Sequence, residues 1–183
     1  MHFVDIFLIS LALAADAFAV AVCIGIGIKT KKIYPCIIVG LYFGLFQTAM
    51  PVVGYFAGNF LAARITMIDH WVTFALLTLI GANIIFSAIK GDDGVKNLSL
   101  APLVMVPLAV ATSIDAMAIG ISFAFDDTSI LLAAITIGVV AFALSILGVR
   151  CGDMLGEKFK TQAAITAGVV LITMGVRSLV LHL

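Results

Sequence analysis

Two aspartates lie near the middle of two long apolar segments, each in a similar short phrase. Asp16 lies in Ala15–Val20 (ADAFAV), and Asp115 lies in Ile114–Ile119 (IDAMAI). An ionisable group at the centre of a bilayer costs roughly 2.5–3.5 kcal/mol, so its presence twice in matching context predicts a function for both. Two carboxylates at matching depth can share a cation. The alternative is a structural role, in which each aspartate hydrogen-bonds a neighbouring helix.

Other oxygen donors are predicted at the same depth. Gln47 lies near the middle of the second apolar segment, and Pro51, four residues later, has no N–H to donate to the Gln47 carbonyl. The amide side chain and the freed carbonyl form a predicted ligand pair; the alternative is a simple proline kink with Gln47 bonded to another helix. Thr112 shares a helix face with Asp115 because three residues separate them. Asn83 lies within the third apolar segment.

These donors define the chemistry of the predicted site. Carboxylate, amide, hydroxyl and carbonyl oxygens suit Mn²⁺, Mg²⁺ or Ca²⁺ better than Cu⁺ or Zn²⁺. The three histidines form no cluster, which argues against a zinc site, and the three cysteines are interpreted as small apolar residues. No cofactor is expected, since the cation would be the substrate. The predicted metal-binding residues are Asp16, Asp115, Gln47, Thr112 and Asn83, of which Asp16 and Asp115 would also carry the coupled protons.

The composition excludes an ordinary soluble domain. The mean hydropathy is +1.27, and 63% of the residues are hydrophobic whereas only 11% are charged, compared with about 25% charged in soluble domains. The lipid bilayer is therefore a predicted partner, and the absence of a basic patch argues against nucleic acid. No GxxxxGK[ST] motif occurs in the sequence, so ATP is not expected to drive a process within this chain.

Apolar runs separated by short polar breaks predict six transmembrane helices, since about 20 residues span a bilayer. The lipid interior offers no water to backbone groups, so the spans should all be helical. The fold class predicted is an all-α, polytopic membrane protein. The six spans are Phe3–Ile28, Ile33–Ala62, His70–Ile89, Leu100–Phe125, Ser129–Arg150 and Gln162–Leu183.

The placement of cations predicts the orientation. The loops after the first, third and fifth spans contain seven lysines, whereas the opposite side offers only Arg64. By the positive-inside rule, the lysine-bearing loops are cytoplasmic and both termini are extracytoplasmic. The lysines are Lys29, Lys31, Lys32, Lys90, Lys96, Lys158 and Lys160.

The two halves of the chain can be aligned beyond the aspartates. Three glycines of the second span match, at a constant offset, one glycine of the fifth span and two that follow it, and Gly81 of the third span matches Gly175 of the sixth. These matches predict an internal duplication, with repeats 1–97 and 98–183. Because each repeat has three spans, the second would be inverted, an arrangement that places a transporter's substrate at the midplane. The three matched pairs are Gly40 with Gly138, Gly54 with Gly152, and Gly58 with Gly156.

Short stretches from the first span to the fifth carry a family resemblance. They are Asp16–Ala19, Gly40–Gly44, Thr48 with Pro51 and Gly54, His70–Trp71, and Ala111–Ala118. The chain thereby resembles the MntP family of bacterial manganese efflux pumps, within the superfamily of cation and amino-acid exporters. The resemblance implies six helices in three-helix repeats, export of Mn²⁺ across the bacterial inner membrane, and Asp16 and Asp115 as functional carboxylates. The chain departs from the family pattern at Gln47 and Ser87, where some relatives are acidic.

We therefore expect a secondary transporter and not an enzyme. Export of a divalent cation from a negative interior works against roughly 5 kcal/mol at 100 mV. Proton antiport would supply it, with metal binding releasing protons from Asp16 and Asp115. The alternatives are export of another divalent cation or of amino acids, a non-transporting scaffold subunit, and an intramembrane aspartyl protease, which also needs two aspartates. Such proteases place one aspartate in a Gly-x-Gly-Asp context, which neither aspartate has.

Overall fold

The described part of the chain is built from helices. The computed structural model describes residues 3–27, 33–61, 100–125 and 129–180, together with positions 74, 75, 78, 79, 81, 82, 85, 86 and 89. Four helices are defined, and no β-strand occurs among the described positions. They are α1 (Phe3–Gly27), α2 (Tyr34–Leu61), α4 (Pro102–Phe123) and α5 (Ile130–Val180).

Each of these helices contains an apolar stretch long enough to cross a membrane. The stretches are Phe3–Gly27, Tyr34–Gly58, Pro102–Phe123 and Ile130–Leu155. Large apolar side chains also cover the outside of the bundle, for example Leu103 at 89% exposure, Phe125 at 71% and Leu45 at 65%. An exposed apolar surface of this kind is expected where the solvent is lipid.

Prolines mark two helix starts, at Pro35 of α2 and Pro102 of α4, and two helix interiors. Pro102 begins α4 directly after Ala101, whose backbone is extended (φ −64°, ψ 139°), and at this position a missing N–H costs nothing. Pro51 lies inside α2 and Pro107 inside α4. Each interior proline removes one helical hydrogen bond, so a backbone carbonyl four residues earlier is left without its usual donor.

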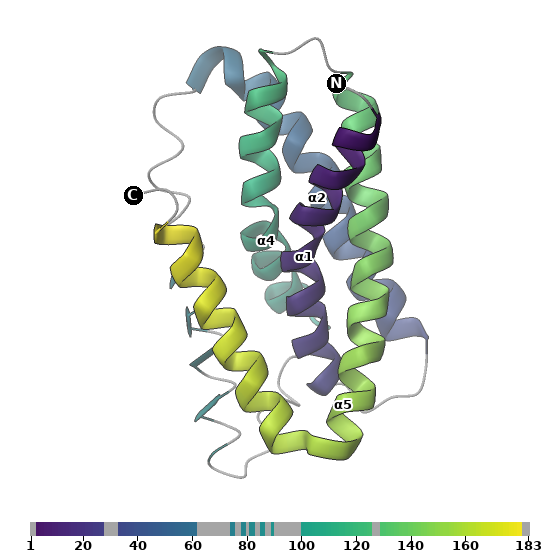
Figure 1. Cartoon of the computed structure of the whole chain (residues 1–183), viewed down its shortest axis with the longest axis vertical. Helices are drawn as coiled ribbons and strands as arrows, with labels where there is room; N and C mark the ends of the chain where they lie inside the picture. The colour runs from purple at the N-terminus through teal and green to yellow at the C-terminus, as the bar shows by residue number, and fades with distance from the viewer. Residues whose placement is uncertain are drawn as a thin grey trace.

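The helices form a bundle in which sequence neighbours are not the main packing partners (Figure 1). α1 and the first part of α5 run side by side in the same direction, whereas α2 and α4 run the opposite way. At the lower end of the view α5 changes direction, and its C-terminal part runs back upward. α1 packs chiefly on α5, and α2 packs on both α4 and α5. α1 and α4 touch over a short stretch only, and α1 scarcely touches α2.

Glycines allow α1 and α5 to approach closely. A Cβ atom placed on Gly148 would lie 2.7 Å from the carbonyl oxygen of Phe18, and one on Gly152 would collide with the carbonyl of Val22. Because each obstruction is a backbone atom, rotation of a side chain cannot relieve it. This contact therefore belongs to the small-residue type of membrane helix packing, in which backbones meet directly.

The contact between α2 and α4 is built in the same way. A Cβ atom on Gly54 would collide with the carbonyl of Met117, and one on Gly120 would collide with the carbonyl of Pro51. Both helices contribute a glycine, so each backbone fits into a gap in the other. Two tightly packed parallel pairs result, α1 with α5 and α2 with α4.

The antiparallel contact between α2 and α5 joins these two pairs. A Cβ atom on Gly40 would lie 3.0 Å from the ring of Phe142, and one on Gly138 would lie 2.9 Å from the carbonyl oxygen of Gly44. Thr48, one turn after Gly44, also lies against Gly138. This crossing is close but relies partly on side-chain atoms that can move.

Comparison with the predicted spans shows one wrong boundary. The spans predicted at Phe3–Ile28, Ile33–Ala62 and Leu100–Phe125 are confirmed within two residues as α1, α2 and α4. The break predicted between Gly152 and Thr161 is wrong as a helix end, because α5 remains helical from Ile130 to Val180. That stretch contains no proline, and its lysines and glutamate favour helix over loop.

The remaining fold predictions are not tested. The predicted span His70–Ile89 falls largely outside the described residues, although the described positions between 74 and 89 are helical. The total of six spans, their inverted repeat, the division at residue 97 and the placement of both termini outside the cytoplasm stay predictions.

Candidate functional site

Two clusters of buried apolar side chains divide the interior of the bundle. One cluster, here called the upper cluster, combines the N-terminal parts of α1 and α5 with the C-terminal part of α4, segments that lie at the upper end of Figure 1. It consists of Ile6, Phe123, Ala133 and Ile137, with Ile9, Leu13, Tyr55, Ile119 and Ile130 packed against it. The lower cluster combines the C-terminal half of α1 with the N-terminal parts of α2 and α4. Its members are Ala17, Val20, Ala21, Cys23, Ile24, Ile26, Cys36, Val39, Phe43, Met105, Leu108, Ala109 and Val149.

On α1 and α4, polar residues occupy the stretch between the two clusters. Asp16 lies between Leu13, packed on the upper cluster, and the lower-cluster residues that begin at Ala17. Asp115 lies between Ala109 of the lower cluster and Ile119, packed on the upper one, and both aspartates are half-buried. Thr112 and Ser113 lie in the same stretch of α4, and both are buried.

On α2 and α5, too, a polar residue lies along the helix between residues of the two clusters. Gln47 follows Phe43 of the lower cluster and precedes Tyr55, packed on the upper cluster. Ser145 follows Ile137 of the upper cluster and precedes Val149 of the lower one. All four helices therefore place polar side chains between the same two apolar regions. We call this set the polar band: Asp16, Gln47, Thr112, Ser113, Asp115 and Ser145.

α1 and α4 each contribute residues to both clusters, on either side of their aspartates. In the upper cluster Ile9 of α1 and Ile119 of α4 pack on the same core, and in the lower cluster Val20 and Leu108 do so. α1 and α4 run in opposite directions (Figure 1), and each has a stretch between its contributions to the two clusters. Asp16 and Asp115 both lie in those stretches.

Gln47 is bound on one side of its amide group only. The side chain is 0% exposed, and its Nε2 donates a hydrogen bond to the backbone carbonyl of Thr112 at 2.8 Å. Its Oε1 is buried without a hydrogen-bond partner, which costs about 1–3 kcal/mol in a protein interior. The bond to another helix that belongs to the alternative interpretation of Gln47 is thus present, while the amide oxygen is left without a partner.

The hydroxyls of α4 are already engaged. Thr112 Oγ1 donates to the carbonyls of Leu108 and Ala109, each at 3.1 Å, and Ser113 Oγ donates to the carbonyl of Ala109 at 2.6 Å. A hydroxyl that donates to a helix carbonyl still has oxygen lone pairs to offer a cation. Thr112 can therefore act as a ligand without losing its helical bond.

Ser145 is the member of the polar band that the sequence reasoning missed. Its side chain is 0% exposed, and its Oγ has no hydrogen-bond partner. A signal was present, because Ser145 stands at the same offset from Gln47 as Gly138 from Gly40 and Gly152 from Gly54. Extending the glycine alignment to polar residues would have found it.

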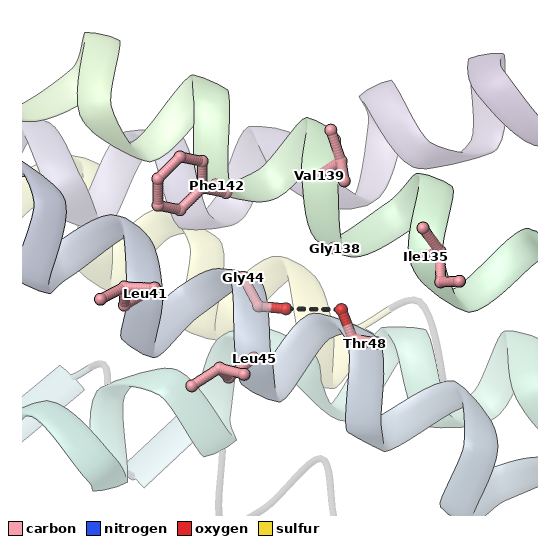
Figure 2. Close-up of a pocket in the computed structure, with 8 residues that line it drawn as sticks. All are labelled: Leu41, Gly44, Leu45, Thr48, Ile135, Gly138, Val139 and Phe142. Carbon is pink, nitrogen blue, oxygen red and sulfur yellow. Dashed lines mark hydrogen bonds between the residues drawn. The ribbon is translucent and has the colours of Figure 1, made fainter.

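A separate groove lies between α2 and α5, and Figure 2 shows its lining. Thr48 Oγ1 in this groove donates to the carbonyl of Gly44 at 2.8 Å. The other side chains are apolar, and several are exposed on the lipid-facing side, so the groove supplies no charged ligand. Its lining residues are Leu41, Gly44, Leu45, Thr48, Ile135, Gly138, Val139 and Phe142.

The donor set of the polar band is mixed. Within the described ranges, no group of three or more His, Cys, Asp or Glu side chains is placed to hold a metal ion. A cation in the polar band would therefore need neutral oxygens as well as carboxylates. Asp16, Asp115, Gln47 and Thr112 of the predicted ligands belong to the band, whereas Asn83 lies outside the described residues.

Apolar helices of membrane-spanning length, a lipid-type outer surface and a buried polar band define a multi-pass integral membrane protein. The sequence pattern of a family described as "Mntp: Putative manganese efflux pump" matches residues 30–179. The chain belongs to this family, and the resemblance read from its motifs is confirmed.

Individual relatives agree with this assignment, and each carries the name "Putative manganese efflux pump MntP". The protein from Mannheimia succiniciproducens is 45% identical over 78% of this chain and 77% of its own length. The one from Desulfitobacterium hafniense is 42% identical over 98% of this chain and 95% of its own. The one from Acetivibrio thermocellus is 41% identical over 100% of this chain and 93% of its own. No solved structure matches the chain.

Proposed function

We propose that this chain exports Mn²⁺ from the cytoplasm across the bacterial inner membrane by proton antiport, with the cation bound in the polar band. The observation that carries the proposal is the band itself, in which all four helices place polar groups between two apolar clusters. Asp16 and Asp115 supply the charge, and Gln47 Oε1 and Thr112 supply neutral oxygens. The names of the relatives support Mn²⁺ as the cargo.

The two apolar clusters act as barriers on either side of the bound cation. A hydrated divalent ion cannot enter closely packed apolar side chains, so each cluster must open in turn to admit or release it. Binding of Mn²⁺ displaces protons from the carboxylates, and protons from outside later displace the metal. Export against 100 mV requires roughly 5 kcal/mol for two charges, and protons entering down the same potential offset it.

An inverted repeat would give both sides of the membrane equivalent access. The α2–α5 crossing supports it, since the contact of Gly40 with Phe142 has its counterpart in the contact of Gly138 with Gly44 at the predicted offset. Such a relation makes α2 equivalent to α5, and α1 to α4. Asp16 and Asp115 then become equivalent positions on either side of one pseudo-two-fold axis.

The proposal is tested first in cells. Expression of the chain should lower cellular Mn²⁺ in a strain that lacks its own exporter, whereas Asp16→Asn and Asp115→Asn should not. Asp5→Asn is the matched control, because Asp5 is exposed near the start of α1, outside the polar band. Depletion of Mn²⁺ by both band variants, at the level of the unsubstituted chain, would overturn the site.

Substrate and coupling are tested in proteoliposomes. Uptake of Mn²⁺ is compared with that of Mg²⁺, Cd²⁺ and lysine, which separates manganese export from export of another cation or of amino acids. Under an imposed pH gradient, Mn²⁺ movement should be accompanied by proton movement in the opposite direction. Metal flux that is independent of the pH gradient and moves no protons would refute antiport.

A further inference from the structure

We propose that Ser145 is a further cation-binding residue, which supplies the oxygen ligand from α5 as Gln47 supplies it from α2. The role assigned to Ser145 rests on the proposed export function. Among the described residues, Gln47 Oε1 and Ser145 Oγ are the buried oxygens of the polar band that have no hydrogen-bond partner. They stand on different helices at equivalent positions of the aligned halves.

The contacts of α5 place Ser145 beside the turn of α1 that carries Asp16. Gly148 and Gly152, three and seven residues after Ser145, lie against Phe18 and Val22 of α1. Residues at this spacing share one helix face, and α1 and α5 run in parallel. One turn earlier on both helices, Ser145 therefore lies level with residues 14–17.

Several buried positions near the level of Ser145 are occupied by alanine. Ala14 and Ala17 of α1 and Ala141 of α5 are each 0% exposed. None of these alanine side chains can accept or donate a hydrogen bond.

Two other buried serines in these helices do form a hydrogen bond, so the lack of one at Ser145 is not a general property of serines in a helix. Ser10 Oγ donates to the carbonyl of Ile6 at 2.7 Å, and Ser113 Oγ donates to the carbonyl of Ala109 at 2.6 Å. A serine within a membrane helix usually makes this bond to the carbonyl four residues earlier. Ser145 does not, which leaves both the proton and the lone pairs of its oxygen available.

A hydroxyl oxygen suits the proposed cargo. Mn²⁺ accepts carboxylate, carbonyl and hydroxyl oxygens, whereas a thiolate favours softer ions. A hydroxyl ligand beside Asp16 and an amide ligand beside Thr112 and Asp115 would give each end of the path one carboxylate and one neutral oxygen. The cation could then pass between the two ends without losing every protein ligand at once.

The decisive test exchanges the hard oxygen for a soft sulfur. Ser145→Cys is compared with Ser10→Cys, an equally buried serine outside the polar band. Both variants keep Cys23, Cys36 and Cys151, so any difference comes from the new thiol. Mn²⁺ flux into proteoliposomes is measured with increasing Cd²⁺, and the reaction of each protein with a water-soluble thiol reagent is followed with and without Mn²⁺.

For Ser145→Cys we expect Cd²⁺ to inhibit Mn²⁺ flux at a concentration about tenfold lower than for Ser10→Cys, as expected for a change at a metal ligand. Mn²⁺ should also slow labelling of the new thiol at position 145 and leave labelling of Ser10→Cys unchanged. Equal Cd²⁺ sensitivity of the two variants, with labelling at position 145 that Mn²⁺ does not slow, would overturn the role of Ser145.

A second variant, Ser145→Ala, provides a test if Ser145→Cys does not fold. Ser145→Ala removes only an oxygen that makes no hydrogen bond, and Mn²⁺ binding to the purified folded protein should weaken about tenfold. Unchanged Mn²⁺ affinity in Ser145→Ala would refute the assignment. If the unsubstituted chain moves no Mn²⁺, the proposed export function is refuted. If the chain exports Mn²⁺ and substitutions at position 145 do not change Mn²⁺ binding, only the role of Ser145 is refuted.

Discussion

Substitution of Gly148 by alanine tests the direct backbone contact between α1 and α5. The added Cβ would lie 2.7 Å from the carbonyl oxygen of Phe18 and 2.9 Å from the Cβ of Ala21. To restore ordinary contact the helices must separate by about 0.7 Å, which weakens dispersion contacts along the pair. Overpacking against backbone costs about 2–3 kcal/mol, and the better helix propensity of alanine returns about 1 kcal/mol. We expect a net loss of about 1–2 kcal/mol.

The assay is thermal unfolding of the purified protein in detergent, followed by circular dichroism. For a chain of this length the loss corresponds to a Tm lowered by roughly 2–8 °C. Gly40→Ala is the matched control, because its Cβ would meet side-chain atoms of Phe142 and Ile146 at 3.0–3.1 Å, and these can turn aside. Its Tm should stay within about 2 °C of the parent. A Gly148→Ala protein as stable as the parent, with Gly40→Ala the less stable of the two, would refute the reasoning.

Three further predictions concern the polar band and the orientation of the chain. Gln47→Leu should abolish Mn²⁺ export in proteoliposomes, and retained export would contradict the ligand role. Its Tm should change by only about 2–4 °C, because the loss of one hydrogen bond is offset by the removal of an unpaired buried oxygen. Pro51→Ala restores an N–H donor for the Gln47 carbonyl, so Tm should rise and the initial rate of Mn²⁺ export should fall. A faster export rate would argue against a role for the freed carbonyl. Cys151 is exposed while Cys23 and Cys36 are buried, so a membrane-impermeant thiol reagent should modify Cys151 alone. The reagent should reach Cys151 only from the cytoplasmic side. Mass spectrometry of membranes labelled from each side tests both expectations.

Much of the fold could be predicted because membrane helices follow from one physical requirement. An apolar run of sufficient length has to satisfy its own backbone hydrogen bonds in lipid, so α1, α2 and α4 begin and end where the hydropathy changes. The same rule failed between Gly152 and Thr161, because polar residues with high helix propensity can leave the membrane without ending the helix.

The candidate site could be predicted only in part. Asp16, Asp115 and Gln47 stand out because polar groups are rare in apolar segments. Binding of a cation by these residues stays a prediction. Ser145 did not stand out, since a lone serine is common in membrane helices and usually bonds its own backbone. Its unpaired hydroxyl becomes visible only when the hydrogen bonds of neighbouring helices are known.

The partners of α1 and α2 have a consequence for biogenesis. Each of these helices emerges early from the ribosome, yet α1 packs chiefly on α5, and α2 packs on α4 and α5. The surface of α1 that packs on α5 therefore lacks its partner until α5 is inserted, and α5 begins more than 100 residues after the end of α1. Docking of α1 is consequently a late, post-insertion event, and truncation before α5 should leave α1 inserted without its main packing partner, while α2 can still pack on α4.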